Sequence, residues 1–178
     1  MVTPTQKKML VALNGQQTET PPLWLMRQAG RHLKEYLEIR AQAENFLDFC
    51  YTPDLAVEAT LQPIRRYGFD AAILFSDILV IPDALGQQVD FVPGTGPKLE
   101  AISSVEGLKK LSKDRLHDHL APVYEAIGRI RNELPDETTL IGFAGAPWTV
   151  ATYVVEGGGS KDYQTTRKWA YGAPEEFG

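Results

Sequence analysis

The sequence predicts a parallel α/β fold that is truncated at its C-terminus. Three short segments are apolar at every position, as strands covered on both faces are, and longer amphipathic stretches lie between them. Only three such strands are evident in 178 residues, and the last six residues, APEEFG, are typical of the first turn of a further helix. We therefore interpret residues 1–178 as one partial α/β domain.

The expected strands lie near the start, the middle and the end of the chain. The first is PLWLM at 22–26, the second opens AAILFSDILVI at 71–81, and the third opens TLIGFAGAP at 139–147. A separate segment, VDFVPGTGPKLEAI at 89–102, predicts a β-hairpin that turns at Pro-Gly-Thr-Gly-Pro.

Helix start and stop residues separate these strands. Thr52 suits an N-cap, Pro53 suits the first helical position, and Gly68 ends the run. Three more helices are expected at 115–134, from Pro147 to Gly157, and from a Ser160 cap to about Tyr171.

Composition excludes several classes of function. The formal net charge of −5 gives no reason to expect a nucleic acid or an anionic membrane as partner. The single cysteine, Cys50, has no partner for an internal disulfide, which suits a reducing compartment. The first ten residues lack the apolar core of a signal peptide, and no apolar run approaches the ~18–20 residues that span a bilayer. We expect a cytoplasmic protein.

Each expected strand is followed by a segment that can carry chemistry. These segments are Arg27–Arg31, the pair Ser76 and Asp77, and Gly145–Trp148. Ligands of parallel α/β folds gather at the carboxyl ends of the strands, so the three segments should meet on one face.

Two arginines follow the first expected strand. Arg27 and Arg31 are four residues apart and would share one face of a helical turn, where like charges repel unless an anion lies between them. Guanidinium binds carboxylate in a planar, two-pronged geometry, and Gly30 allows a ligand to approach the backbone. The alternative is a solvated helix start with scattered charges.

Asp77 follows the second expected strand among apolar neighbours, where a carboxylate needs a partner or a purpose. Its alternative role is a helix N-cap or turn residue.

His117 and His119 lack further ligands at metal-binding spacing, and the glycine run at 157–159 lacks the spacing of a phosphate loop.

Four segments of the chain resemble the uroporphyrinogen decarboxylase family. They are PPLWLMRQAGRHLKEY, FSDIL, VPGTGP and GFAGAPWTVATYVVEGGG, within a resemblance that runs from about Pro21 to Tyr171. The chain departs from the family pattern at His32, Lys34 and Leu37, where the family has Tyr, Pro and often Arg.

The resemblance implies a (β/α)8 barrel, of which this chain supplies the first three to four strands with their helices and a hairpin insertion. It implies a cytoplasmic, homodimeric lyase of haem biosynthesis that decarboxylates the four acetates of uroporphyrinogen without metal or organic cofactor. The site residues that it implies are Arg27, Arg31 and Arg40 for substrate, Asp77 as the essential carboxylate, and Tyr153. We expect Asp77 and Arg27 to be catalytic.

Two alternatives stay open at this point. One is a methyltransferase of the same superfamily that acts on corrinoid or thiol substrates through a zinc site, although no Cys/His ligand set is evident. The other is a non-catalytic fragment or a pseudoenzyme that binds porphyrinogen without turnover.

Overall fold

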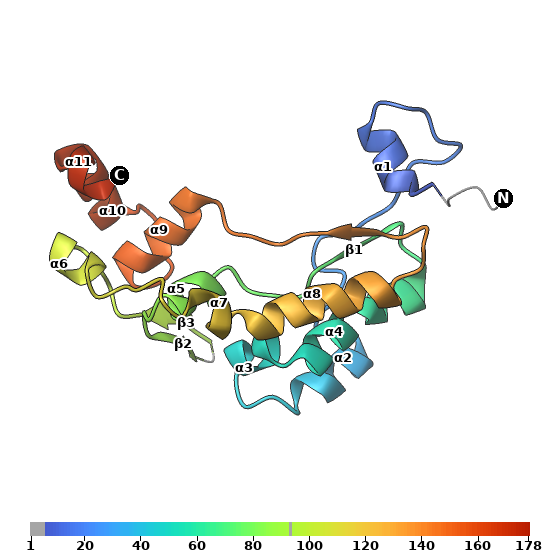
Figure 1. Cartoon of the computed structure of the whole chain (residues 1–178), viewed down its shortest axis with the longest axis horizontal. Helices are drawn as coiled ribbons and strands as arrows, with labels where there is room; N and C mark the ends of the chain where they lie inside the picture. The colour runs from blue at the N-terminus through green and yellow to red at the C-terminus, as the bar shows by residue number, and fades with distance from the viewer. Residues whose placement is uncertain (1–5, 93) are drawn as a thin grey trace. The chain divides into compact units, whose positions relative to one another are not determined.

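The computed structural model describes residues 6–92 and 94–178, which form two compact units (Figure 1). The first unit holds the described residues up to Ser76 together with Pro122–Phe143. The second unit holds Asp77–Ala121 and Ala144–Gly178.

The first unit is built on two parallel strands, which confirms the α/β class. Strand β1 (Ala71–Ile73) pairs with β4 (Thr139–Ile141), and Ala71 lies opposite Thr139 in the register. The Leu74 N–H extends the pairing by donating to the Ile141 carbonyl oxygen at 3.0 Å. The helices of this unit are α1 (Lys8–Leu13), α2 (Lys34–Arg40), α3 (Phe46–Tyr51), α4 (Pro53–Tyr67) and α8 (Ala121–Glu133), whose first residue counts with the second unit.

The expected strand at 22–26 is wrong. Pro22, the first residue of this segment, has no N–H to donate. The Leu23 N–H donates to the Asp70 carboxylate at 2.6 Å and not to a backbone carbonyl oxygen. One backbone bond, from the Asp70 N–H to the Leu23 carbonyl oxygen, joins the segment to the residue before β1. Leu23 and Leu25 are at least half exposed, although a strand covered on both faces would bury them. The apolar run at 22–26 was therefore not sufficient to predict a strand.

Helix α4 begins and ends where the sequence predicts. Pro53 is its first residue, and Gly68 ends it in the left-handed conformation with φ of 64°. The Thr52 hydroxyl does not cap the helix, because it donates back to the Asp48 carbonyl oxygen at 2.8 Å. Thr60 joins α4 to the chain after β1, since its hydroxyl accepts the Phe75 N–H at 3.0 Å.

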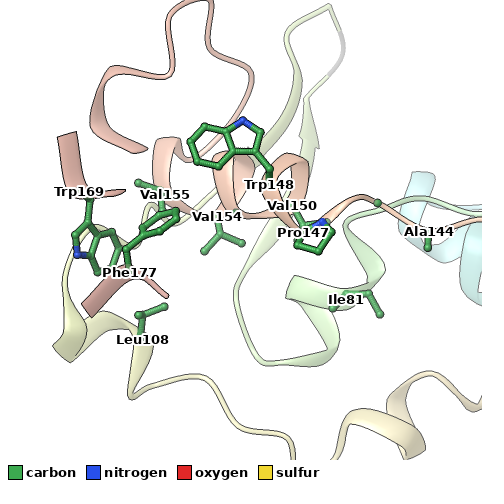
Figure 2. Close-up of a pocket in the computed structure, with 12 residues that line it drawn as sticks. Ile81, Leu108, Ala144, Pro147, Trp148, Val150, Val154, Val155, Trp169 and Phe177 are labelled. Carbon is green, nitrogen blue, oxygen red and sulfur yellow. The ribbon is translucent and has the colours of Figure 1, made fainter. Parts of the chain in front are cut away.

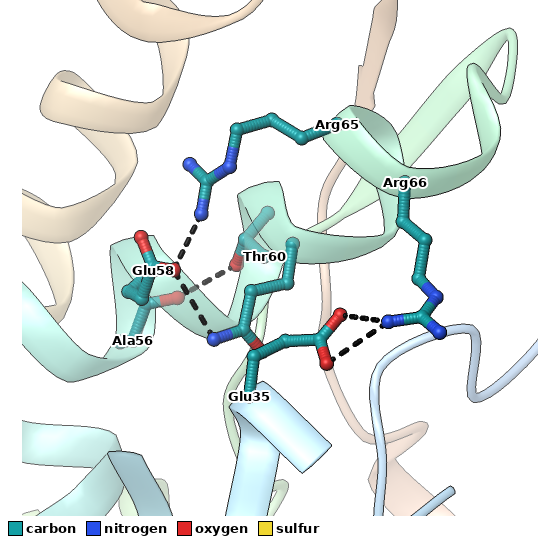
Figure 3. A network of polar contacts seen from close by, with 7 residues as sticks. Glu35, Ala56, Glu58, Thr60, Arg65 and Arg66 are labelled. Atoms are coloured by element: carbon teal, nitrogen blue, oxygen red, sulfur yellow. Dashed lines mark hydrogen bonds and ion pairs between the residues drawn. The ribbon is translucent and has the colours of Figure 1, made fainter. Parts of the chain in front are cut away.

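An aromatic cluster packs α2 and α3 against Phe75, which lies two residues after β1. Phe49 is fully buried, and its ring lies 4.7 Å from that of Phe75 and 5.6 Å from that of Tyr36. Glu35 of α2 pairs with Arg66 of α4 at 2.8 Å on the outside of this core, as Figure 3 shows. The cluster anchors Phe75, two residues before Asp77 in the chain.

The second unit contains the predicted hairpin and shorter helices. Strands β2 (Val89–Val92) and β3 (Gly96–Leu99) are antiparallel, while Pro93 in the predicted turn lies outside the described residues. The helices are α5 (Val80–Ala84), α6 (Val105–Leu108), α7 (Leu116–His119), α9 (Pro147–Glu156), α10 (Gln164–Gly172) and α11 (Pro174–Phe177).

Helix α9 confirms the predicted start at Pro147 and end at Gly157, whose φ is 74°. The helix expected at 115–134 is divided into α7 and α8 at Leu120. The helix expected from Ser160 begins later, at Gln164, because the Ser160 hydroxyl accepts the Tyr163 N–H and forms a turn before it.

Candidate functional site

Arg27 occupies the third position of a tight turn from Leu25 to Gln28. The Gln28 N–H donates to the Leu25 carbonyl oxygen at 3.2 Å, and Arg27 has φ of 59°. Met26 is not among the residues with positive φ, so the pair of conformations is that of a type II turn. The expected helical turn shared by Arg27 and Arg31 is therefore wrong, since α2 begins only at Lys34.

Arg27 has a backbone conformation that residues other than glycine rarely adopt. The third position of a type II turn favours glycine, because the left-handed region costs other residues about 1–2 kcal/mol. The Arg27 side chain is exposed, so packing into the core does not explain its presence. Strained residues of this kind cluster at binding and catalytic sites.

Replacing Arg27 by glycine is expected to stabilise the chain by about 0.5–1 kcal/mol, because glycine adopts a positive φ without strain. Urea unfolding of the 178-residue chain measures the change. Met26→Gly is the matched control: Met26 is 76% exposed and has no positive φ, so the same substitution should destabilise there. Equal destabilisation by both substitutions would contradict a strained Arg27.

Arg31 and Arg40 lie near the same phenol. Burial raises the pKa of the Tyr36 hydroxyl, and the positive charges of Arg40 and Arg31 act against that shift. Arg31 is exposed, whereas Arg40 is half-buried at the end of α2. Arg40 also donates to the Ala43 carbonyl oxygen at 3.1 Å and lies 5.7 Å from the centre of the Phe49 ring, so it already supports the connection to α3.

The loop between the first two arginines is not closely packed at Gly30. A Cβ at this glycine would meet its nearest neighbour, the His32 ring, at an ordinary 3.6 Å. Lys34, where the family pattern has proline, is the first residue of α2, a position that proline favours but does not require. The departures at His32 and Lys34 are therefore compatible with this local structure.

Asp77 is a half-buried carboxylate at the start of the second unit. Its Oδ1 accepts the Leu79 N–H at 2.8 Å, and Asp77 makes no ion pair among the residues that the structure describes. Burial raises the pKa of Asp77, while the Leu79 hydrogen bond opposes the shift. Asp77 therefore acts as a turn residue, the alternative that the sequence left open. This role uses only one carboxylate oxygen, and no cation among the described residues pairs with the carboxylate.

The segments that follow β1 and β4 lie side by side in the second unit. A Cβ at Gly145 would come within 2.6 Å of Val150 Cγ2 and 3.0 Å of Ile78 Cβ. Only glycine fits without displacing these neighbours. Because β1 and β4 are parallel, both segments leave the sheet at the same edge, as the sequence predicted for these two of its three segments.

Tyr153 is half-buried on α9. Other residues of this helix line an apolar cavity, among them Trp148, Ala151 and Val155, but Tyr153 is not one of the lining residues. The structure thus places Asp77 and Tyr153 in the second unit and the three arginines in the first.

The apolar cavity has a volume of about 530 Å³ and lies within the second unit (Figure 2). Trp148, Trp169 and Phe177 form an aromatic side of it, with the Trp169 and Phe177 rings 5.8 Å apart. Among the residues that the structure describes, those that line it are all uncharged. Trp148 is 47% exposed, so its indole is not buried in a core.

The described part of the chain contains neither a metal-binding cluster nor a membrane-spanning helix. Across residues 6–92 and 94–178, no three His, Cys, Asp or Glu side chains are grouped so that they could hold a metal ion. In the same ranges, no helix is long and apolar enough to cross a membrane.

Sequence reasoning missed Gln28. Its side chain is only 4% exposed, and it makes hydrogen bonds on both sides of the arginine turn. The available signal was an amide side chain directly beside Arg27.

Comparison with known proteins identifies close relatives. The family model described as Uroporphyrinogen decarboxylase (URO-D) matches residues 4–178. A protein named uroporphyrinogen decarboxylase from Sinorhizobium fredii is 58% identical over 97% of this chain and 50% of its own length. Its namesake from Rhodobacter capsulatus is 60% identical over 93% of this chain and 48% of its own length. The chain spans about half the length of the curated relatives that it matches.

A solved structure has the same fold. A methyltransferase from Methanosarcina mazei matches with a TM-score of 0.72 over 98% of this chain and 50% of its own, at 18% sequence identity. This likeness supports the fold alone.

Proposed function

Because this chain belongs to the uroporphyrinogen decarboxylase family, with similarity to the N-terminal half of its relatives, we propose that it supplies that half of a carboxy-lyase. The complete enzyme would convert uroporphyrinogen III to coproporphyrinogen III in the cytoplasm. The single observation that carries the proposal is Arg27, a cationic side chain held at a glycine-favouring position four residues before Arg31 in the chain.

The proposed architecture is the first part of a (β/α)8 barrel. β1 and β4 are then adjacent barrel strands, and the segment 22–26 lies at the place of the strand before β1. The hairpin of β2 and β3 is an insertion. The remaining strands would complete the barrel, and two complete chains would form the homodimer.

Binding follows from the charge of the substrate, which carries eight carboxylates. Arg27, Arg31 and Arg40 would supply counter-charges and two-pronged hydrogen bonds that lysine does not reproduce. Arg40 keeps free N–H donors for this purpose, because the structure uses one nitrogen, Nη1, for the Ala43 carbonyl oxygen. The Tyr153 hydroxyl is a further proposed contact.

The chemistry needs an electron sink, and the pyrrole can be that sink. Protonation of a ring carbon makes the ring cationic. The C–C bond to the acetate carboxyl then breaks, carbon dioxide leaves, and the electron pair neutralises the ring as an exocyclic methylene. A proton then adds to the methylene carbon to give a methyl group, and loss of the proton from the ring carbon restores the pyrrole. Because the substrate itself accepts these electrons, the reaction requires neither a metal nor an organic cofactor.

Asp77 is proposed to stabilise the cationic ring. Its carboxylate would accept the pyrrole N–H bonds and lie close to the developing positive charge, fixed in place by the Leu79 N–H. Partial burial strengthens such an electrostatic interaction because less water screens it. Arg27 would position the reacting acetate or take part in its proton transfer.

The function can be tested in a full-length chimera. Residues 1–178 replace the matching half of the Rhodobacter capsulatus relative, and the C-terminal half of that relative completes the chain. We expect the chimera to release four molecules of carbon dioxide per uroporphyrinogen, with coproporphyrinogen as product, as chromatography of the oxidised porphyrins would show. A folded chimera that leaves uroporphyrinogen unchanged, beside an active Rhodobacter protein, would contradict the proposal.

In this chimera, Arg27→Lys and Arg31→Lys should each lower kcat/KM at least about tenfold, worth ~1.4 kcal/mol. Lysine keeps the charge but loses the planar pair of N–H donors. Arg131→Lys, at an exposed position of α8, is the matched control and should change little. Full activity of both site variants would show that the arginines act only as a diffuse charge patch.

A further inference from the structure

Gln28 is a buried polar side chain beside an exposed one. Its side chain is 4% exposed, whereas its chain neighbour Arg27 points into solvent. A buried amide that loses its partners carries a desolvation cost, so the hydrogen bonds of Gln28 define one arrangement of the surrounding backbone.

The acceptor end of the amide closes the arginine turn. Gln28 Oε1 accepts the Leu25 N–H at 3.3 Å, while the Gln28 backbone N–H donates to the Leu25 carbonyl oxygen at 3.2 Å. The two bonds join the same pair of residues in opposite directions. Met26 and Arg27 are the only residues between them, so the turn is closed on both sides.

The donor end of the amide fixes the turn to the sheet. Gln28 Nε2 donates to the Ala71 carbonyl oxygen at 3.1 Å, in the first residue of β1. Asp70, one residue earlier, holds Leu23 through its carboxylate and its backbone N–H. The segment is thus attached to the start of β1 at both Leu23 and Gln28.

We propose that Gln28 is a positioning residue for Arg27: its amide closes the Leu25–Gln28 turn, ties it to β1, and so holds the Arg27 backbone in the left-handed conformation that directs its guanidinium to the substrate carboxylate. Gln28 touches no substrate itself. The inference rests on the proposed function, since it requires that Arg27 acts on substrate.

The first test measures the turn itself in the 178-residue chain. Gln28→Met keeps the length of the side chain and removes both of its hydrogen bonds. Amide hydrogen exchange at Leu25 should become at least tenfold faster, while exchange in α4 stays unchanged. The matched control is Gln62→Met, at a second buried glutamine of the same unit, which bonds to Glu58 within α4. The control should leave exchange at Leu25 unchanged.

The second test is a double-mutant cycle in the full-length chimera, with kcat/KM as the measurement. Gln28→Met alone should lower kcat/KM at least tenfold. In an Arg27→Ala background the same substitution should lower it less than threefold, because the side chain that Gln28 positions is already gone. A purely structural glutamine would lower activity by the same factor in both backgrounds.

The outcomes separate this inference from the function on which it rests. Unchanged exchange at Leu25, or equal losses in both backgrounds, would overturn the role of Gln28 and leave the proposed function standing. A folded chimera with the native sequence and no decarboxylation would overturn both. If Gln28→Met unfolds the chain, Gln28→Asn takes its place, since it keeps the amide but is one methylene too short to span both bonds.

Discussion

Replacing Asp77 by asparagine in the full-length chimera is expected to lower turnover of uroporphyrinogen by ~10²–10³, the usual effect of removing a preorganised partner of a developing charge. Asparagine keeps the size of the side chain and can still accept the Leu79 N–H through its oxygen. The fold of the segment should therefore remain, and the loss should appear in kcat. Steady-state rates at saturating substrate measure it.

The same substitution should not destabilise the protein. Burial raises the folded-state pKa of Asp77, so its charged form is less favourable in the folded protein than in the unfolded chain. Any stability associated with Asp77 is therefore present at low pH and lost as the pH rises through the folded pKa. At neutral pH, Asp77→Asn should unfold at the same or a higher urea concentration than the native sequence, and the difference should vanish in acid.

Asp90→Asn is the matched control for both measurements. Asp90 is an exposed carboxylate of the second unit, where it accepts a hydrogen bond from Gln88 at 2.9 Å. Its substitution should change neither turnover nor the urea concentration at which the chain unfolds at neutral pH. Turnover close to that of the native sequence in Asp77→Asn would remove Asp77 from the mechanism.

Helix start and stop residues made much of the fold predictable from the sequence. A proline at the first helical position and a glycine at the helix end are single-residue signals. Helices α4 and α9 confirm both signals, at Pro53 and Gly68 and at Pro147 and Gly157. The structure also contains the second and third expected strands, as β1 and β4, which pair with each other in parallel.

The missed features depend on contacts that are distant in sequence. The Leu23 N–H bonds to the Asp70 side chain, 47 residues away, and no local pattern distinguishes this from a strand ladder. Likewise, a spacing of four between Arg27 and Arg31 suggests a helix, but Gln28 instead closes a turn with support from Ala71. The candidate residues were named from motif and chemistry, and their roles stay predictions, while the positive φ of Arg27 became evident only from the structure.

The 178-residue chain on its own is expected to show no decarboxylation of uroporphyrinogen. In the proposed barrel it would supply three to four of eight strands, and the described part of the chain pairs only β1 with β4 in parallel. A barrel closes only when every strand has two neighbours, and the substrate cleft is built from loops of all its parts. The part of the substrate cleft that the later strands would build is then missing.

Adding the missing half as a separate polypeptide tests this directly. The C-terminal half of the Rhodobacter capsulatus relative, co-expressed with residues 1–178, should restore coproporphyrinogen formation, because apolar strand edges of the two halves can pair as they do within one chain. The same mixture made with Asp77→Asn should lack most of that activity, which shows that turnover comes from this chain. Decarboxylation by residues 1–178 alone, at a rate comparable to the chimera, would show that the site is complete without a second half and that the proposed partial barrel is wrong.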